Sequence, residues 1–361
     1  MGLPSIAIAF KEKGITAIKR SQRGIDVLIL KEEDPTKFTS PYTIYTTTDI
    51  PSTLNDFNKE QIELALMGYQ TSPKKVLVYI ESKTAENYND ILVTLENQRW
   101  DYLVIPEIAD SETQTIATWI KGMRTTKDKK VKAILPNIKA DNEGVINFTN
   151  SIIKTKAKTF TTAEYCSRIA GLIAGTPMTI ACTFAPLSEV IECDTHSKEQ
   201  YDSKVEAGEL FFFNDGEKIK IARGVNSFTT TIQDKGDSFK KIKLVDAMDM
   251  IHDDIKKTAE DNYLGKYANS YDNKCLLISA IQGYFDQLEL DGILDPKKNS
   301  VGINVEQQKV YLLSIGSYTA DELAEMTDQE IKEANTKDKV FLKASIKILD
   351  AIEEIDLPII I

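Results

Sequence analysis

The residues that most often carry chemistry in proteins are scarce in this sequence. It has two histidines, His196 and His252, and a nucleophile activated by an imidazole base would need one of them. His196 stands beside a predicted helix start, and His252 lies next to two aspartates on the polar side of another predicted helix. No G-x-S-x-G motif occurs in the chain. Catalysis by either histidine is therefore disfavoured.

The four cysteines form no C-x-x-C pair, and a chain of 361 residues does not need disulfides to hold its core. We therefore expect reduced, buried thiols. Cys193 and His196, with Cys182 upstream, offer three metal ligands, but a fourth is missing and the spacing is irregular. A thiol and a surface imidazole are favoured over a metal site. The cysteines are Cys166, Cys182, Cys193 and Cys275.

Signals for phosphate or cofactor binding are also missing from the sequence. There is no G-x-x-x-x-G-K-[ST] motif, and no G-x-G-x-x-G motif follows a predicted strand. The glycines of "AGLIAG" (170–175) fall within a predicted helix, where they favour close helix packing. Neighbouring carboxylates such as Glu353 and Glu354 point apart, which indicates solvated charge. We expect no cofactor, no metal and no enzymatic activity.

The composition narrows the possible partners. Hydrophobic residues make up 42% of the chain, enough for a sizeable core, and the formal net charge is -11. Nucleic-acid binding is disfavoured because phosphate contacts need a local excess of Lys and Arg. No apolar window reaches the length of a membrane span, and the first residues do not have the pattern of a secretory signal, so we expect no membrane partner.

The first half of the chain alternates strand and helix patterns. Apolar runs predict strands at 24–30, 42–48, 74–80, 101–106 and 130–136, and helical periodicity predicts helices at 58–68, 85–98, 110–124 and 161–175. A βαβ series of this kind predicts an α/β domain with a mainly parallel sheet covered by helices.

The pattern changes to α+β after about residue 208. "NDG" at 214–216 predicts a hairpin, and helices are expected at 238–261 and 273–290. An acidic helix is expected at 319–335, with Thr319 and Glu322 as its capping box. The alternation in "KVFLKASIKIL" then predicts a half-buried strand. Its apolar side chains include Leu342, Ala344, Ile346 and Ile348.

Two extended apolar segments lie near the two ends of the sequence. "SIAIAF" places Ile6, Ile8 and Phe10 on one face, and "IDLPIII" does the same for Ile355, Leu357, Ile359 and Ile361. Pro358 has no N–H to donate, so the second segment suits a sheet edge. The pattern leaves two interpretations open: each segment completes the sheet of its own chain, or it joins the sheet edge of a neighbouring chain.

Three stretches together resemble a known family: "EYCSRIAGLIAGTPMTIACTFAPL" (164–187), "IARGVNSFTTT" (221–231) and "FKKIKLVDAMDMIHDDIKK" (239–257). They are similar to contractile phage tail sheath proteins, in particular the short sheaths of phages and phage-tail-like bacteriocins of Gram-positive bacteria. The order of segments resembles the family over essentially the whole chain.

The resemblance implies a structural subunit in a virion or phage-tail-like particle. Six subunits would form each ring, and stacked rings would surround an inner tail tube and contract to drive it through a bacterial envelope. Further partners would be baseplate and tail terminator proteins. Each subunit would lend both terminal segments to neighbouring subunits, with Leu342, Ala344, Ile346 and Ile348 in the acceptor strand. Hinges are expected near Gly14 and at 350–354.

The implied domains are an N-terminal arm (1–18), an outer α/β domain (19–225), an inner α+β domain with a small sheet (226–349) and a C-terminal arm (350–361). The inner domain would face the tube, and Lys240, Lys241 and Lys243 are candidates for contacting it. Two alternatives stay open: another self-assembling tail or baseplate protein, and an α/β hydrolase-like enzyme.

Overall fold

The computed structural model describes residues 17–21, 23–85 and 87–360. These residues divide into two compact units. The α/β unit comprises Ser21–Met250 and Asp350–Ile361. The second unit comprises Ile251–Leu349 together with the described residues before Ser21. The division falls inside helix α6 (Ile242–Asn262), whereas the sequence places the domain boundary at residues 225–226.

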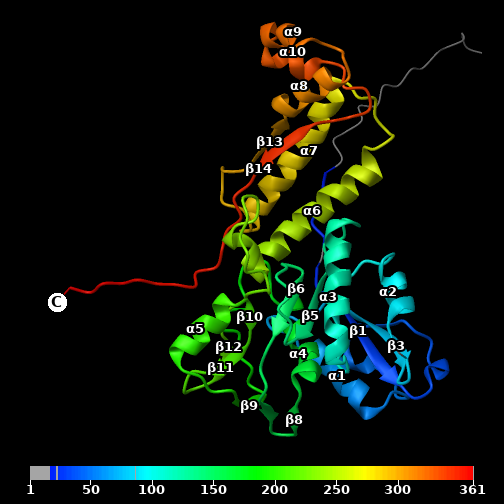
Figure 1. The fold of residues 1–361 in the computed structure, drawn as a ribbon, viewed down its shortest axis with the longest axis vertical. Helices are drawn as coiled ribbons and strands as arrows, with labels where there is room; N and C mark the ends of the chain where they lie inside the picture. The colour runs from blue at the N-terminus through cyan, green and yellow to red at the C-terminus, as the bar shows by residue number, and fades with distance from the viewer. Residues whose placement is uncertain (1–16, 22, 86, 361) are drawn as a thin grey trace, which may run out of the picture. The chain divides into compact units, whose positions relative to one another are not determined.

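Within the described residues, a seven-stranded sheet organises the α/β unit (Figure 1). Its order is β10-β6-β5-β4-β1-β3-β2, and all neighbours are parallel except β2 and β3. The predicted mainly parallel sheet is confirmed. The strands are β1 (Ile25–Glu32), β2 (Tyr42–Ile44), β3 (Lys75–Ser82), β4 (Tyr102–Val104), β5 (Lys132–Pro136), β6 (Val145–Phe148) and β10 (Glu209–Leu210).

Helices bury both faces of this sheet, which explains the continuous apolar runs in its strands. Leu28 and Leu30 of β1 belong to a core cluster shared with α1 and α4. Val27 and Ile29 point to the opposite face and join a second cluster with α2 and α3. The helices of this unit are α1 (Asp56–Leu66), α2 (Asn89–Leu95), α3 (Asp110–Thr125), α4 (Thr162–Ala174) and α5 (Lys198–Glu206), with 3-10 turns at η1 (Pro35–Lys37), η2 (Thr47–Asp49) and η3 (Asp237–Lys240).

The glycines of α4 allow two helices to approach closely, as the sequence predicts. A Cβ on Gly171 would lie 1.8 Å from the carbonyl oxygen of Ala65 in α1. A Cβ on Gly175 would lie 2.0 Å from the carbonyl oxygen of Thr71. Since both nearest atoms are backbone, neither contact could be relieved by turning a side chain, so these glycines serve packing and not phosphate binding.

Two smaller sheets complete the α/β unit among its described residues. One has the order β8-β7-β9, and the other is the hairpin predicted at "NDG", in which Gly216 has φ +100°. The hairpin's second strand ends at Ile221, and the "RGVNSFT" segment (223–229) that follows it is a loop. The strands are β7 (Ile153–Thr155), β8 (Thr159–Phe160), β9 (Val190–Cys193), β11 (Phe212–Asn214) and β12 (Ile219–Ile221).

The second unit is built around α7 and a small antiparallel sheet, which has two strands in the described part of the chain. The predicted acidic helix is two helices, α9 and α10, because Thr327 starts a second capping box with Glu330. The first capping box, of Thr319 with Glu322, is present as predicted. The elements are α7 (Tyr271–Leu290), β13 (Ser300–Ile303), α8 (Val305–Ser314), α9 (Ala320–Glu325), α10 (Asp328–Glu333) and β14 (Leu342–Ser345).

Three of the four cysteines are buried, as expected. All four cysteines are free; Cys166, Cys182 and Cys193 are buried, and Cys275 is half-buried. Burial raises the pKa of the Cys182 thiol to about 12, so it is protonated at neutral pH. None of the helices described here is long and apolar enough to span a membrane.

Candidate assembly surfaces

Two aspartates of the "KIKLVDAMDMI" segment fix the start of α6 to the large sheet. Asp246 and Asp249 are three residues apart and therefore share one face of the helix. Tyr102 of β4 donates a hydrogen bond from Oη to Asp246 Oδ2 (2.6 Å), and Lys132 of β5 forms ion pairs with both carboxylates. Arg124 of α3 donates to both oxygens of Asp249 at 2.9 Å. We call these five residues the α6 root.

The α6 root is a buried charge cluster in which each ion has a partner. Burial by itself would raise the pKa of Asp249, but the positive charges of Lys132 and Arg124 lower it to about 2. Arg124 has a second partner, Glu143, at 3.5 Å, and Glu143 also pairs with Lys235 at 3.0 Å. Removing one ion would leave others buried without compensation, so this cluster holds the helix start firmly.

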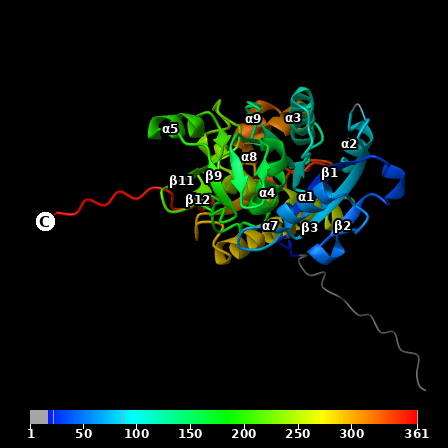
Figure 2. The same cartoon turned by 90° about the horizontal axis from the view of Figure 1, so that it is seen from below.

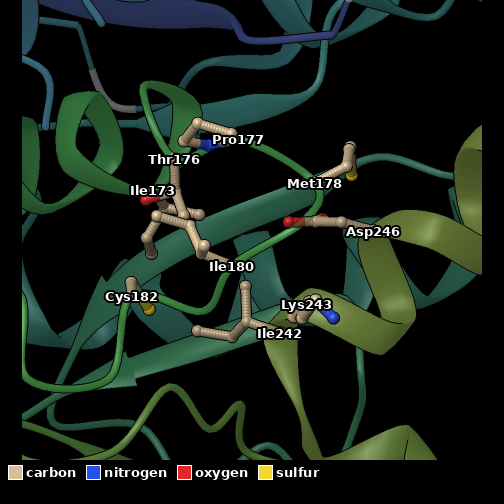
Figure 3. A pocket seen from close by; sticks show the side chains of 9 residues that line it. All are labelled: Ile173, Thr176, Pro177, Met178, Ile180, Cys182, Ile242, Lys243 and Asp246. Atoms are coloured by element: carbon tan, nitrogen blue, oxygen red, sulfur yellow. The ribbon is translucent and has the colours of Figure 1, made fainter. Parts of the chain in front are cut away.

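A small pocket lies beside the α6 root (Figure 3). Asp246 projects into it from α6, and Ile173 of α4 and Ile180 form part of its wall. Its volume is about 10 Å³, room for about one water molecule. The pocket is therefore a packing gap and not a ligand site.

The "RGVNSFTTT" loop is held to β6 and to the loop before β6 by its backbone N–H groups. Ser227 donates its N–H to the carbonyl of Val145, the first residue of β6, at 2.9 Å. The backbone N–H groups of Thr229 and Thr230 donate to Asp141 Oδ1 at 2.8 and 3.0 Å. The motif that resembles the sheath family thus fixes the chain between the hairpin and α6.

A second charge cluster holds the start of the C-terminal segment. Glu353 accepts hydrogen bonds from Thr183 Oγ1 at 2.5 Å and from Arg223 Nε at 3.1 Å, and it pairs with Lys241 Nζ at 3.0 Å. Lys241 also pairs with Asp350. We call these five residues the arm clamp. Asp350 and Glu353 fall in the segment where the resemblance implies a hinge (350–354), and that hinge stays a prediction.

Burial would raise the pKa of Glu353, but the hydrogen bonds from Thr183 and Lys241 lower it below its ordinary value. The Glu353 side chain is 7% exposed, whereas that of Glu354 is 81% exposed although it pairs with Arg223 at 3.0 Å. The two neighbouring glutamates therefore point apart, as expected, but one of them is not solvated.

Beyond the clamp, the C-terminal segment is extended and projects away from the rest of the α/β unit (Figures 1 and 2). The side chains predicted to share one apolar face are uncovered: Ile355 is 83% exposed, Leu357 72% and Ile359 78%. Ile361 and the N-terminal residues Ile6, Ile8 and Phe10 lie outside the described residues, as does the expected hinge near Gly14. A row of exposed apolar side chains on an unpaired strand is a surface that needs a partner.

The predicted acceptor residues lie in and after β14. Register pairs Ala344 with Val301 and Leu342 with Ile303 of β13. Asn304 donates its N–H to the carbonyl of Phe341. The backbone groups of Phe341 and of every second residue after it therefore face β13. The backbone groups of Leu342 and Ala344 therefore point away from β13. Among the described residues β14 pairs with β13 alone, so this outer edge is open.

The three lysines proposed for tube contact do not form a free basic patch. Lys240 pairs with Asp237 at 2.8 Å, and Lys241 belongs to the arm clamp. Lys243 is 7% exposed. Contact with a tube through these residues stays a prediction, for which Lys240 offers the most accessible charge.

The arm clamp borders an open groove of about 500 Å³. Glu353 and Arg223 form part of its wall, and the remaining lining is mostly aromatic and charged, with neither histidine nor cysteine. His196 stacks edge-on against Tyr201, and His252 contacts Asp253. No group of three metal-ligating residues occurs in the part of the chain that the structure describes.

Sequence reasoning missed the roles of Asp246, Asp249 and Glu353. For the α6 root a signal existed: Asp246 and Asp249 alternate with apolar residues on a helix, and Lys132 interrupts an otherwise apolar strand. Charges at positions that a pattern assigns to the core are normally paired. For Glu353 the local sequence contains no such signal.

Comparison with known proteins agrees with these features. Residues 81–227 match the phage tail sheath protein central domain, and residues 234–361 match the phage tail sheath C-terminal domain. The tail sheath protein of Clostridium phage phiCD119 is 42% identical over 361 residues, which cover 99% of this chain and 98% of that protein.

Solved structures show the same fold. The sheath tail protein of Desulfitobacterium hafniense has 18% identity and a TM-score of 0.70, with 83% of this chain and 94% of that chain covered. The helical sheath of the anti-feeding prophage in its contracted state has 14% identity and a TM-score of 0.71, with 100% of this chain and 99% of that chain covered. The mixed α and β fold class predicted from the sequence is confirmed.

The family consists of structural proteins, in agreement with the prediction that the chain is not an enzyme. The resemblance found in the sequence motifs is likewise confirmed. The chain belongs to the phage tail sheath family, as a structural subunit of a contractile sheath in a phage tail or phage-tail-like particle.

Proposed function

We propose that this subunit forms hexameric rings that stack around an inner tail tube and contract from a metastable extended state, driving the tube through a bacterial envelope. Its partners are further copies of itself, the tube protein, and baseplate and terminator proteins. The subunits are linked by strand donation: the C-terminal segment of one subunit adds to the outer edge of β14 in the next.

The observation that carries this proposal is the exposed apolar row of Ile355, Leu357 and Ile359 on a segment that its own unit leaves unpaired. Adding this segment to a sheet edge would satisfy its backbone groups and cover alternate side chains. Pro358 lacks an N–H, which an added edge strand tolerates and a central strand does not.

The outer edge of β14 offers the complementary surface. The backbone groups of Leu342 and Ala344 point outward, and the Ala344 side chain is exposed, so nothing in the described residues blocks a further strand. Because the donated segment leaves one copy and enters another, the contact is heterologous, and such contacts generate rings or open helices.

Removal of residues 356–361 tests the proposal on the donor side. We expect the truncated subunit to keep the circular dichroism spectrum and melting temperature of the full chain but to form no long sheaths under negative-stain electron microscopy. Long striated sheaths from the truncated subunit would overturn the proposal.

Ala344→Pro tests the acceptor side. Proline removes an N–H that points away from β13, so the pairing of β13 with β14 is retained while the outer edge loses a donor. We expect a folded subunit whose polymers are at least tenfold fewer. Lys343→Ala, a change on the same strand that keeps every backbone donor, is the control and should polymerise normally.

A further inference from the structure

We propose that the arm clamp sets the working length of the C-terminal arm, and thereby the spacing between linked subunits. This inference rests on the proposed strand donation. The arm clamp marks the point at which the donated segment leaves its own subunit. The carboxylate of Glu353 lies at the centre of the clamp.

The clamp is built from segments far apart in the sequence. Thr183 follows α4, Arg223 follows β12, and Lys241 immediately precedes α6. All three converge on one carboxylate, that of Glu353, at 2.5 to 3.1 Å. A carboxylate held by two cations and a hydroxyl, with a side chain 7% exposed, has a fixed position, unlike the exposed residues on either side of it.

The clamp changes where the free chain begins. The last backbone pairing of the β14 segment is the hydrogen bond from Leu349 N–H to the carbonyl of Ile293, within the second unit. Without the clamp, the free segment would start at Asp350. With the clamp, Asp350–Glu354 is held against the α/β unit, and the free segment starts at Ile355.

The arm reaches much farther without the clamp than with it, by more than the spacing between two neighbouring strands. An extended chain spans roughly 3.3 Å per residue, so the clamped arm of residues 355–361 reaches about 23 Å. Release of residues 350–354 would add about 17 Å. While the clamp is intact, the acceptor sheet of the neighbouring subunit must lie within the reach of residues 355–361. Force on the arm then passes to the α/β unit and not to β14.

The adjacent glutamates provide a matched pair of variants. Glu353→Gln keeps the side-chain volume but removes the charge that Arg223 and Lys241 face. Each cation keeps one more exposed carboxylate, Glu354 or Asp350, so neither is left without a counter-charge, while the segment loses its buried anchor. Glu354→Gln removes the same charge from a side chain that is 81% exposed, and it is the control.

The first readout uses the free subunit and does not depend on polymerisation. Brief digestion with proteinase K, followed by mass spectrometry, maps how far the C-terminal segment is trimmed. We expect wild type and Glu354→Gln to be trimmed no further than residue 354. Glu353→Gln should be trimmed back to residues 349–352 at a rate at least fivefold higher. Identical trimming of all three proteins would overturn the proposal, because the clamp would then not hold the segment.

The second readout uses assembled sheaths. We expect Glu353→Gln to form sheaths whose ring spacing, measured by electron microscopy, is more variable than in wild type, while Glu354→Gln sheaths match wild type. Altered trimming with unchanged ring spacing would show that the clamp does not set the arm length. If wild type itself forms no sheaths, the strand-donation proposal fails, and the trimming result still reports on the clamp.

Discussion

The α6 root and the arm clamp are two charge clusters of similar chemistry in very different surroundings. In the α6 root the side chains of Arg124, Lys132, Asp246 and Asp249 are between 1% and 11% exposed. In the arm clamp Glu353 is equally buried, but Lys241 and Arg223 are 26% and 33% exposed. The two clusters differ in how much water reaches their cations, so we expect breaking the α6 root to cost more stability than breaking the arm clamp.

The largest effect is expected from Asp249→Asn. Arg124 would lose two charge-assisted hydrogen bonds in a buried setting, and Lys132 would lose one of its two carboxylates. We expect the free energy of unfolding to fall by about 3–5 kcal/mol, as is usual when one partner of a buried pair is removed. Urea titration of the free subunit measures it. If the free energy of unfolding fell by less than about 1 kcal/mol, as for a surface ion pair, the prediction would be wrong.

Acid should loosen the α6 root in a defined pH window. The pKa of Asp249 is lowered from 3.8 to about 2, so its stabilising contribution is complete above about pH 4 and is lost as the pH falls toward 2. Urea midpoints measured from pH 6 to pH 2.5 should decline less steeply in Asp249→Asn than in wild type. Parallel curves for the two proteins would contradict this.

Another buried carboxyl sharpens the comparison because the described residues offer it no hydrogen-bond partner. Asp26 of β1 is fully buried, and neither oxygen has a hydrogen-bond partner among the described residues. Burial and the charge of Asp101 raise its pKa well above 3.8, so its contribution to stability is complete below that pH and is lost as the pH rises. Asp26→Asn should therefore be at least as stable as wild type at pH 8, with the difference shrinking toward pH 4. A loss as large as that of Asp249→Asn would show that Asp26 has a stabilising contact.

The smallest change in stability is expected from Glu353→Gln. Two of its partners are partly exposed, so we expect the free energy of unfolding to change by less than about 1 kcal/mol, although the trimming of the arm changes strongly. Urea titration beside the trimming assay separates the two effects. A loss above about 3 kcal/mol would mean that the clamp belongs to the core of the fold.

Local patterns in the sequence predict much of this fold, and they fail where tertiary contacts decide. The central strands and α1, α3, α4 and α7 follow from apolar periodicity, because both sheet faces are buried. The strands β6 and β10 are short and take their sheet positions from long-range pairing, which no local pattern reports. The break between α9 and α10 was predictable from the Thr327 and Glu330 capping box.

Among the candidate assembly residues, too, some follow from a local sequence pattern and others depend on tertiary contacts. Alternation identifies Ile355, Leu357 and Ile359 as one face of an extended segment, and the structure leaves all three exposed. The clamp could not be predicted, because Thr183, Arg223 and Lys241 are brought to Glu353 only by the fold. The acceptor edge of β14 likewise depends on which backbone groups β13 uses.

A cryo-EM reconstruction of sheaths assembled from the full chain tests the central claim most directly. The account predicts continuous density that leaves the arm clamp of one subunit and pairs residues 355–360 with the outer edge of β14 in another subunit. Density that returns this segment to a sheet of its own subunit would contradict strand donation.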